Sequence, residues 1–177
     1  MRVITGSARG RSLVTLQGDD VRPTTDRVKE AVFSILQFDL EGRTVLDLFA
    51  GSGQLGIEAL SRGAQKCIFV DADKNAVKVI KTNLEKTQLT DKGTVFNSDA
   101  FSYLRFCNEK FHIALLDPPY SKGILERALP VVAKNMADSG IIVCELPFSD
   151  NEPQAPEGFT LYKTYKYGKI KILVFRN

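Results

Sequence analysis

Two acidic segments contain the residues best suited to chemistry: DLFAGSGQLG, residues 47–56, and DPPY, residues 117–120. The first has the spacing G-x-G-x-x-G beginning at Gly51, which matches the dinucleotide-binding fingerprint. Glycines in such a loop let a ligand approach the backbone closely, whatever that ligand is. Asp71 follows Gly51 by 20 positions, and its carboxylate could accept hydrogen bonds from both hydroxyls of a ribose. The segment therefore predicts a site for a cofactor that contains a nucleoside.

Asp47 separates the candidate cofactors. The predicted strand ends at this aspartate, and three residues intervene before Gly51, whereas in the dinucleotide fold the strand usually runs straight into the first glycine. A carboxylate at this place disfavours a nearby diphosphate and favours a cationic ligand such as a sulfonium amino acid. We therefore expect a sulfonium cofactor, with an NAD(P)-dependent oxidoreductase as the alternative.

The DPPY segment supplies acceptors and an aromatic ring. Pro118 and Pro119 fix φ and remove two N–H donors, so the local polar atoms are the Asp117 carboxylate and the Pro118 carbonyl. A rigid pair of acceptors suits an amino group that must donate both of its hydrogens. Tyr120 offers a ring on which a planar base can stack, worth about 1–3 kcal/mol. The alternative interpretation is a turn after a buried strand, for which one proline would suffice.

Alternating strand-like and helix-like runs would position these two segments. Period-2 and continuous apolar runs predict strands at 2–6, 11–16, 44–49, 66–73, 93–99, 111–120, 140–147 and two within 158–177 that turn near Gly168. Helical spacing predicts helices within 22–36, 54–63, 74–89, 100–107 and 123–136. This order predicts a single-domain, Rossmann-like α/β fold: a mostly parallel sheet with helices on both faces, a C-terminal antiparallel edge, and an N-terminal hairpin and helix. Ligands of such sheets bind beyond the carboxyl ends of the strands, where both acidic segments fall.

The bulk composition excludes several classes of protein. No apolar run approaches the roughly 20 residues of a membrane span, and the first residues lack the apolar core of a signal peptide, so we expect a cytoplasmic protein with no membrane contact. Cys67, Cys107 and Cys144 have no C-x-x-C spacing and predict buried thiols rather than a metal site or a disulfide. His112, the single histidine, is expected in a strand, which argues against a histidine-based triad.

The net charge of +3 is unevenly distributed. Residues 1–18 carry three arginines and no acid, residues 158–177 carry five basic residues and no acid, and the remainder is therefore acidic. Ordinary solvated charge would explain either end alone. Both ends together make a polyanionic partner a hypothesis to test.

The combination of DLFAGSG with a later DPPY resembles the class I S-adenosylmethionine-dependent amino-methyltransferases. The segments MRVITGSARGR, VRPTTDRVKEAVF, LGIEALSRGA and FHIALLDPPYSKG resemble one branch closely, the bacterial 16S rRNA guanine-N2 methyltransferases named for nucleotide 966. The resemblance spans nearly the whole chain. The sequence departs from the family at Gln54, where a small residue is more usual, and YGKIKILVF matches the final hairpin only loosely.

The resemblance implies an enzyme that transfers methyl from S-adenosylmethionine to N2 of a specific guanine in 16S rRNA. The predicted catalytic residues are Asp117, Pro118, Pro119 and Tyr120. The predicted cofactor contacts are Asp47, Phe49, Gly51, Gly53, Asp71, Asp99, Ala100 and Thr24. The predicted RNA contacts are Arg9, Arg11, Arg22, Arg27 and Lys122, and no metal is expected. Asp99 fits a helix N-cap and an adenine contact equally well.

Residues 1–40 are expected to form an RNA-facing extension and residues 41–177 the methyltransferase domain. The expected partner is 16S rRNA within a small-subunit particle, the protein is expected to be a monomer, and the target base would swing out of its stack to reach Tyr120. Adenine N6, a glutamine side chain and, from another class, a catalytically silent RNA-binding module stay open as alternatives. The preferred form of the rRNA, naked, part-assembled or complete, also stays open.

Overall fold

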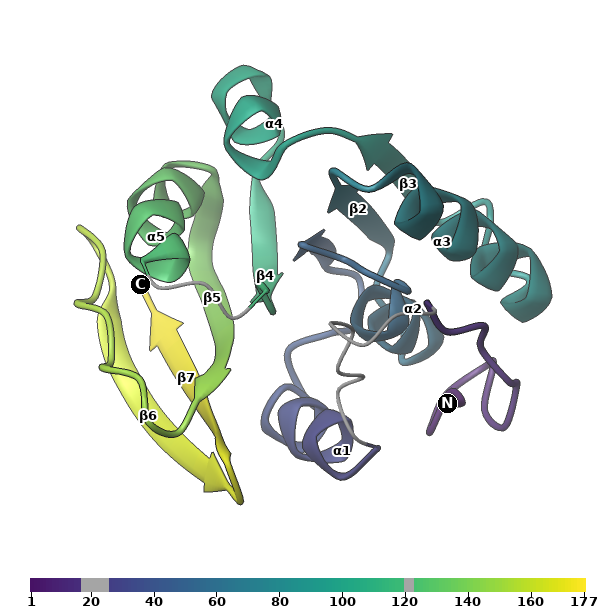
Figure 1. Cartoon of the computed structure of the whole chain (residues 1–177), viewed down its shortest axis with the longest axis horizontal. Helices are drawn as coiled ribbons and strands as arrows, with labels where there is room; N and C mark the ends of the chain where they lie inside the picture. The colour runs from purple at the N-terminus through teal and green to yellow at the C-terminus, as the bar shows by residue number, and fades with distance from the viewer. Residues whose placement is uncertain (17–25, 120–122) are drawn as a thin grey trace.

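The computed structural model describes residues 1–16, 26–119 and 123–177, in which one sheet carries helices on both faces (Figure 1). The strands are β1 (Thr44–Leu48), β2 (Lys66–Asp71), β3 (Gly93–Asn97), β4 (Phe111–Leu116), β5 (Met136–Pro147), β6 (Thr160–Tyr167) and β7 (Ile170–Arg176). The helices are α1 (Asp26–Ile35), α2 (Gln54–Ser61), α3 (Lys74–Thr87), α4 (Ala100–Phe106) and α5 (Ile124–Lys134). None of these helices is both long enough and apolar enough to cross a membrane.

The sheet has the order β3-β2-β1-β4-β5-β7-β6. Strands β1 to β5 pair in parallel, and β7 pairs antiparallel with both β5 and β6. The predicted Rossmann-like fold with an antiparallel edge is therefore confirmed. The chain order reverses between β1 and β4, so the crevice beyond their carboxyl ends is the place where such folds bind ligands.

Strand β5 begins earlier than predicted, at Met136 rather than at residue 140. The pairs Phe111↔Met136 and Ile113↔Ile141 place one residue of β4 opposite four residues of β5, which is a bulge. Ser139 within it has a left-handed φ of 57°. The segment MADS has no strand-like pattern, so pairing with Phe111 rather than local preference determines this strand end.

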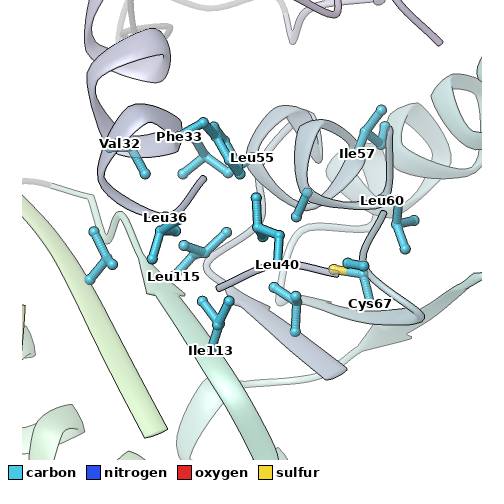
Figure 2. Close-up of a cluster of buried hydrophobic side chains, with 14 of the residues drawn as sticks. Val32, Phe33, Leu36, Leu40, Leu55, Ile57, Leu60, Cys67, Ile113 and Leu115 are labelled. Carbon is cyan, nitrogen blue, oxygen red and sulfur yellow. The ribbon is translucent and has the colours of Figure 1, made fainter. Parts of the chain in front are cut away.

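Two hydrophobic clusters fill the space between the sheet and its helices. One cluster joins α1, α2 and α3 to one face of the sheet, and the other joins α4 and α5 to the opposite face. Figure 2 shows part of the first cluster, where Val32 and Phe33 of α1 lie beside Leu55 of α2 and above Ile113 and Leu115 of β4. The N-terminal helix thus packs into the core that joins the sheet to its helices.

The N-terminal residues turn back on themselves as predicted, but with little strand structure. A single antiparallel bridge joins Arg2 and Ser12, supported by hydrogen bonds from Val3 N–H to the Arg11 carbonyl (2.9 Å) and from Leu13 N–H to the Met1 carbonyl (3.0 Å). The backbone N–H groups from residue 4 to residue 8 that bond outside the turn donate to Glu58 and Ser61 of α2 instead. The correction has a physical reason: a two-stranded hairpin is marginal alone, and docking on a helix replaces the missing ladder.

A buried charge cluster fixes this turn to α2. Glu58, fully buried, accepts from the backbone N–H groups of Ile4 (2.8 Å) and Thr5 (3.0 Å) and forms an ion pair with Arg62 (2.8 Å). Lys29 of α1, also fully buried, lies 3.9 Å from the Glu58 carboxylate and donates to the Arg2 carbonyl. Burial lowers the pKa of Lys29, so its charge depends on these neighbours.

Candidate active site

A pocket of about 540 Å³ lies over the carboxyl ends of β1, β2 and β4; we call it the cofactor pocket. It collects residues from five separate parts of the chain, including the N-terminal segment. Predicted site residues in its wall are Asp47, Phe49, Gly51, Asp71, Asp99, Ala100, Asp117, Pro118 and Pro119. Gly53 is absent from the wall. Thr24, Arg22, Tyr120 and Lys122 fall outside the described residues.

The three fingerprint glycines have different structural roles. Gly51 has a left-handed φ of 54°, and a Cβ there would meet no protein atom within 4 Å, so this residue leaves room for a ligand. Gly53, with φ 76°, is the N-cap of α2 and faces Ile80 rather than the pocket. A Cβ on Gly56 would lie 2.3 Å from the Phe69 ring, so the third glycine serves helix–strand packing. Only the first glycine faces the ligand site.

Phe49 departs from ordinary backbone geometry. Its φ of 66° is left-handed, which costs a non-glycine residue about 1–3 kcal/mol unless its surroundings hold it. Its half-buried ring packs against the cluster beneath α4 and α5. Ala50, the next residue, donates to the Val70 carbonyl at 3.0 Å. The loop is therefore held in its strained form from both sides, at the pocket wall.

Asp71 ties the end of β2 to the glycine loop. Its Oδ2 accepts from the Gly51 N–H at 2.7 Å, and its Oδ1 accepts from the Asp73 N–H at 2.9 Å. Burial raises the pKa of this carboxyl group despite these bonds. Asp71 thus lies in the pocket as predicted and also sets the position of Gly51.

Asp47 lies on β1 and is buried against the start of α2, with only 2% of the residue exposed. Its Oδ2 accepts from the Gly56 N–H at 2.8 Å, one of the donors left free in the first turn of a helix. Burial raises the pKa of Asp47 well above its ordinary value, and the nearby carboxylates of Asp117 and Asp71 raise it further. A positively charged ligand would stabilise the ionised form of Asp47 and offset the repulsion among these carboxylates.

Asp99 is the N-cap of α4. Its Oδ1 accepts from the Ser102 N–H at 2.9 Å, so the capping interpretation is confirmed. The residue also lines the cofactor pocket beside Ala100, the first residue of α4, whose N–H lies among the donors that a helix start leaves unused. Capping uses one carboxylate oxygen, so an adenine contact stays a prediction alongside it.

Asp117, Pro118 and Pro119 follow β4 and form one wall of the cofactor pocket. Asp117 is half-buried, Pro118 is buried and Pro119 is exposed. Pro118 and Pro119 also line a second pocket of about 470 Å³, which we call the side pocket. The acceptor pair predicted from the sequence therefore lies where two pockets adjoin.

Some of the predicted RNA contacts are exposed, and another is hydrogen-bonded within the protein. Arg9 and Arg27 are exposed. Arg11 donates to the Lys86 carbonyl (3.0 Å) and to Gln88 Oε1 (2.9 Å), so it caps the carboxyl end of α3. That cap gives Arg11 a structural role which the charge pattern did not predict.

The basic residues near the C-terminus divide in the same way. Lys166 and Lys169 are exposed, but Lys171 is only 7% exposed and donates to the Asp150 carbonyl at 2.6 Å. The two C-terminal strands expected from the sequence would bring Lys166, Lys169 and Lys171 to the exposed edge of the sheet. That expectation is wrong for Lys171, because the loop after β5 folds over it.

Asn83 is a positioning residue that the sequence analysis missed. Its Oδ1 accepts from the Val14 N–H at 2.7 Å, and its Nδ2 donates to the carbonyls of Val14 (3.0 Å) and Ser52 (2.9 Å). It thereby holds the N-terminal segment beside the glycine loop, where Met1, Thr15 and Leu16 complete the pocket wall. The available signal was a polar residue on the buried face of α3.

Histidine and cysteine lie away from this chemistry. His112 is in β4, as predicted, and its Nδ1 accepts from the Thr44 N–H at 3.3 Å at the amino end of the strands. Cys67 and Cys144 are buried and Cys107 is half-buried, and all three are free thiols. In the part of the chain that the structure describes, no cluster of acidic, histidine or cysteine side chains has metal-binding geometry.

The chain is similar along its length to known proteins. The profile of the family described as "Conserved hypothetical protein 95" matches residues 1–176. YlbH of Bacillus subtilis (strain 168), provisionally named an rRNA methyltransferase, is 39% identical over 99% of this chain and 98% of its own length. Ribosomal RNA small subunit methyltransferase D of Escherichia coli (strain K12) is 33% identical over 99% of this chain and 89% of its own length. The solved structure of Escherichia coli yhhF, provisionally described as a methyltransferase, matches with a TM-score of 0.91 at 31% identity, covering 100% of this chain and 97% of that one.

Proposed function

This chain belongs to the family described as "Conserved hypothetical protein 95", and we propose that it transfers a methyl group from S-adenosylmethionine to the exocyclic N2 of one guanine in 16S rRNA. The names of its relatives support methylation of small-subunit rRNA. The choice of guanine N2 goes further. The rigid acceptor pair of Asp117 and Pro118 at the wall of the cofactor pocket supports transfer to an exocyclic amine, and the choice of guanine follows the resemblance to the guanine-N2 methyltransferases.

The cofactor pocket suits S-adenosylmethionine in access and charge. The backbone at Gly51 is open to a ligand, and the buried Asp47 lies close enough to Asp71 and Asp117 for their charges to raise its pKa. A ligand with a sulfonium and an ammonium group offsets that crowding of negative charge, whereas a diphosphate would add to it. The residues present therefore fit this cofactor better than a dinucleotide.

Each residue of the pocket has a proposed contact. We assign the Gly51 backbone to the methionine and ribose end, and Asp47 to the amino acid portion; Gly53 lies outside the pocket wall and receives no contact in this assignment. Asp71 would accept from the ribose hydroxyls, Asp99 from the adenine amino group, and the Ala100 N–H would face the adenine ring. Thr24 beside the site mouth stays a prediction.

The bound cofactor supplies an electrophilic methyl group on a positively charged sulfur. The protein must activate the guanine amine, a poor nucleophile because its lone pair is delocalised into the ring. Hydrogen bonds from the two N–H groups to Asp117 and to the Pro118 carbonyl localise that lone pair on nitrogen. These bonds strengthen as positive charge develops there, which is the condition for raising the rate. Asp117 or water then takes the proton that the methylated nitrogen releases.

The RNA surface proposed here surrounds the mouth of the two pockets. Residues 1–40 would face RNA through exposed arginines such as Arg9 and Arg27. Arg22, Lys122 and the stacking residue Tyr120 keep their predicted roles. We also propose that a monomer acts on a small-subunit particle in the cytoplasm, where ribosomes assemble.

Methyl transfer to small-subunit particles tests the proposal. Particles isolated from cells that lack the protein should accept labelled methyl from S-adenosylmethionine, and nucleoside mass spectrometry should then detect N2-methylguanosine. N6-methyladenosine as the product would move the target to adenine. No transfer to any rRNA form, together with binding of NAD(P)H and none of S-adenosylhomocysteine, would contradict the proposed enzyme class.

A further inference from the structure

The side pocket adjoins the proposed acceptor pair and is built from different elements than the cofactor pocket. Its wall combines Pro118 and Pro119 with the first turn of α5, the end of β5 and the loop that follows β5. Its volume of about 470 Å³ is ample for a nucleobase. A base whose amino group reaches Asp117 therefore has space here for the rest of its ring.

Glu145 contributes a buried carboxylate side chain to this wall. It lies on β5, and the residue is only 6% exposed. In the parallel pairing of β4 with β5, Leu116 lies opposite Cys144, so the next residues along the two strands are Asp117 and Glu145. On its other side Glu145 pairs with Ile172 of β7. The backbone of Glu145 is thus fixed by neighbouring strands and set beside Asp117, as precise recognition requires.

The Watson–Crick edge of the base determines what such a carboxylate can recognise. Guanine carries an N–H at ring position N1 beside its 2-amino group, whereas adenine carries a bare N1 lone pair beside its 6-amino group. An ionised carboxylate only accepts hydrogen bonds. A carboxylate placed beside N1 accepts a hydrogen bond from the N1–H of guanine. Beside adenine, a lone pair of the carboxylate oxygen would face the lone pair of N1, and the two repel each other. A site built around a substrate N–H strongly rejects an analogue that lacks it.

We propose that Glu145 is the residue that selects guanine, its carboxylate accepting from the N1–H of the base whose amino group faces Asp117 and Pro118. This inference rests on the proposed function above. Glu145 is already engaged within the protein. A carboxylate offers about four lone-pair positions, so a bond from the base adds to those contacts and does not compete with them.

Replacing the N1–H of the substrate tests this assignment without changing the protein. Once the methylated guanine is mapped, particles can be reconstituted with 2-aminopurine at that position, which keeps the 2-amino group and has a bare N1. The intact protein should methylate 2-aminopurine with a kcat/KM at least 100-fold below that for guanine. Equal rates on the two substrates would overturn the proposal.

The variant Glu145→Gln provides the complementary test. Its amide can donate to a bare N1, so the ratio of kcat/KM for guanine over 2-aminopurine should narrow at least tenfold, with S-adenosylhomocysteine affinity unchanged. Glu145→Asp should keep the discrimination at a lower rate, because it keeps an acceptor. The matched control is Glu126→Gln, an exposed acid of the same pocket, which should leave the ratio unchanged.

The outcomes separate this inference from the function on which it rests. N2-methylguanosine formed by the intact protein, with an unchanged ratio in Glu145→Gln, would overturn the role of Glu145 and leave the proposed function standing. An intact protein that forms no N2-methylguanosine would overturn both. A thermal melt of each variant shows whether a lost rate reflects lost folding. If Glu145→Gln does not fold, the ratio of kcat/KM for guanine over 2-aminopurine in Glu145→Asp decides whether Glu145 selects guanine.

Discussion

The Asp71 carboxylate accepts a hydrogen bond from the Gly51 N–H at 2.7 Å, so the end of β2 holds the loop that follows β1. The same carboxylate lines the cofactor pocket. One side chain therefore shapes the loop and faces the ligand that the loop is proposed to bind.

Replacing Asp71 should reveal both roles. Asp71→Ala is expected to weaken binding of S-adenosylhomocysteine by about 1.5–3 kcal/mol, the scale of losing charge-assisted hydrogen bonds. Asp71→Asn keeps an acceptor for the Gly51 N–H and should lose less. Calorimetry measures both, and Asp91→Asn, at an exposed site outside the pocket wall, is the control that should change affinity little. Unchanged affinity in Asp71→Ala would move the ribose contact to another residue.

The pH dependence of stability should report on Asp47. Because burial raises its pKa in the folded state, its stabilising contribution is present below the ordinary value of 3.8 and is lost as pH rises through the raised pKa. The cofactor-free protein should therefore lose thermal stability relative to Asp47→Asn as the pH rises from the ordinary value of 3.8 through the raised pKa. Melting temperatures across that range measure the difference, and Asp91→Asn, at an exposed site, should follow the unmodified protein. Parallel curves for Asp47→Asn would contradict a costly buried charge.

The same carboxyl group predicts an opposite effect on binding. A cationic ligand favours the ionised form of Asp47, so affinity for S-adenosylmethionine should rise with pH over that range. In Asp47→Asn the affinity should be lower and nearly independent of pH. Calorimetry at several pH values distinguishes this from a purely structural role, for which the two pH profiles would coincide.

Asp117 should matter for turnover and little for cofactor affinity. Asp117→Ala is expected to lower methyl transfer at least 100-fold, because it removes an interaction that strengthens in the transition state, while S-adenosylhomocysteine binding stays within a few-fold. Single-turnover transfer of labelled methyl, combined with calorimetry, makes the comparison. Full activity in this variant would remove Asp117 from the mechanism.

Alanine substitutions at two glycines of the loop should have different effects, one mainly on folding stability and the other mainly on cofactor affinity. Gly56→Ala places a methyl group 2.3 Å from the Phe69 ring, so it should cost about 3 kcal/mol of folding stability and leave affinity nearly intact at low temperature. Gly51→Ala should cost only about 1–2 kcal/mol for its left-handed φ. Its methyl group would nevertheless occupy open pocket space, and S-adenosylhomocysteine affinity should fall at least tenfold. Denaturant unfolding and calorimetry on the two variants test this reversal.

Substitutions of Arg9 and Arg11 should affect different properties of the protein, RNA binding in the first case and folding stability in the second. Each phosphate contact steepens the log–log salt dependence of RNA binding by about one released ion. Arg9→Ala should therefore flatten the slope and leave folding unchanged, because its side chain is exposed. Arg11→Ala should lower thermal stability, since it removes the cap of α3. Filter binding at several salt concentrations provides the slopes. An unchanged slope in a variant that combines Arg9→Ala with Arg11→Ala excludes the N-terminal turn as an RNA contact.

The sequence predicts the fold well because apolar periodicity determines it. Each strand from β1 to β5 alternates with a helix, and only the early start of β5 at Met136 depends on pairing with a strand distant in sequence. The site is predicted less completely. Asp47 and Asp71 are identified by their places at the carboxyl ends of strands, whereas the literal glycine fingerprint suggests the wrong cofactor class.

Residues that act through distant backbone groups are the hardest to predict. Glu58 and Asn83 stand out as polar residues on buried helix faces, but their partners Ile4 and Val14 lie 54 and 69 positions earlier. No local pattern shows which backbone groups will face a helix after folding. Lys171 illustrates the reverse case, because only the fold shows that the Asp150 carbonyl covers it.

Strand order also affects how the chain behaves before it is folded. Among the strands described, β6 pairs only with β7, which is synthesised after it yet lies between it and β5. The segment TLYKTYKY must therefore wait unpaired during synthesis, and unpaired strands of this composition readily join other chains. Lys163 and Lys166 interrupt its aromatic residues with charge, which opposes such association. Basic residues of this edge thus protect the nascent protein from aggregation, whether or not they later meet RNA.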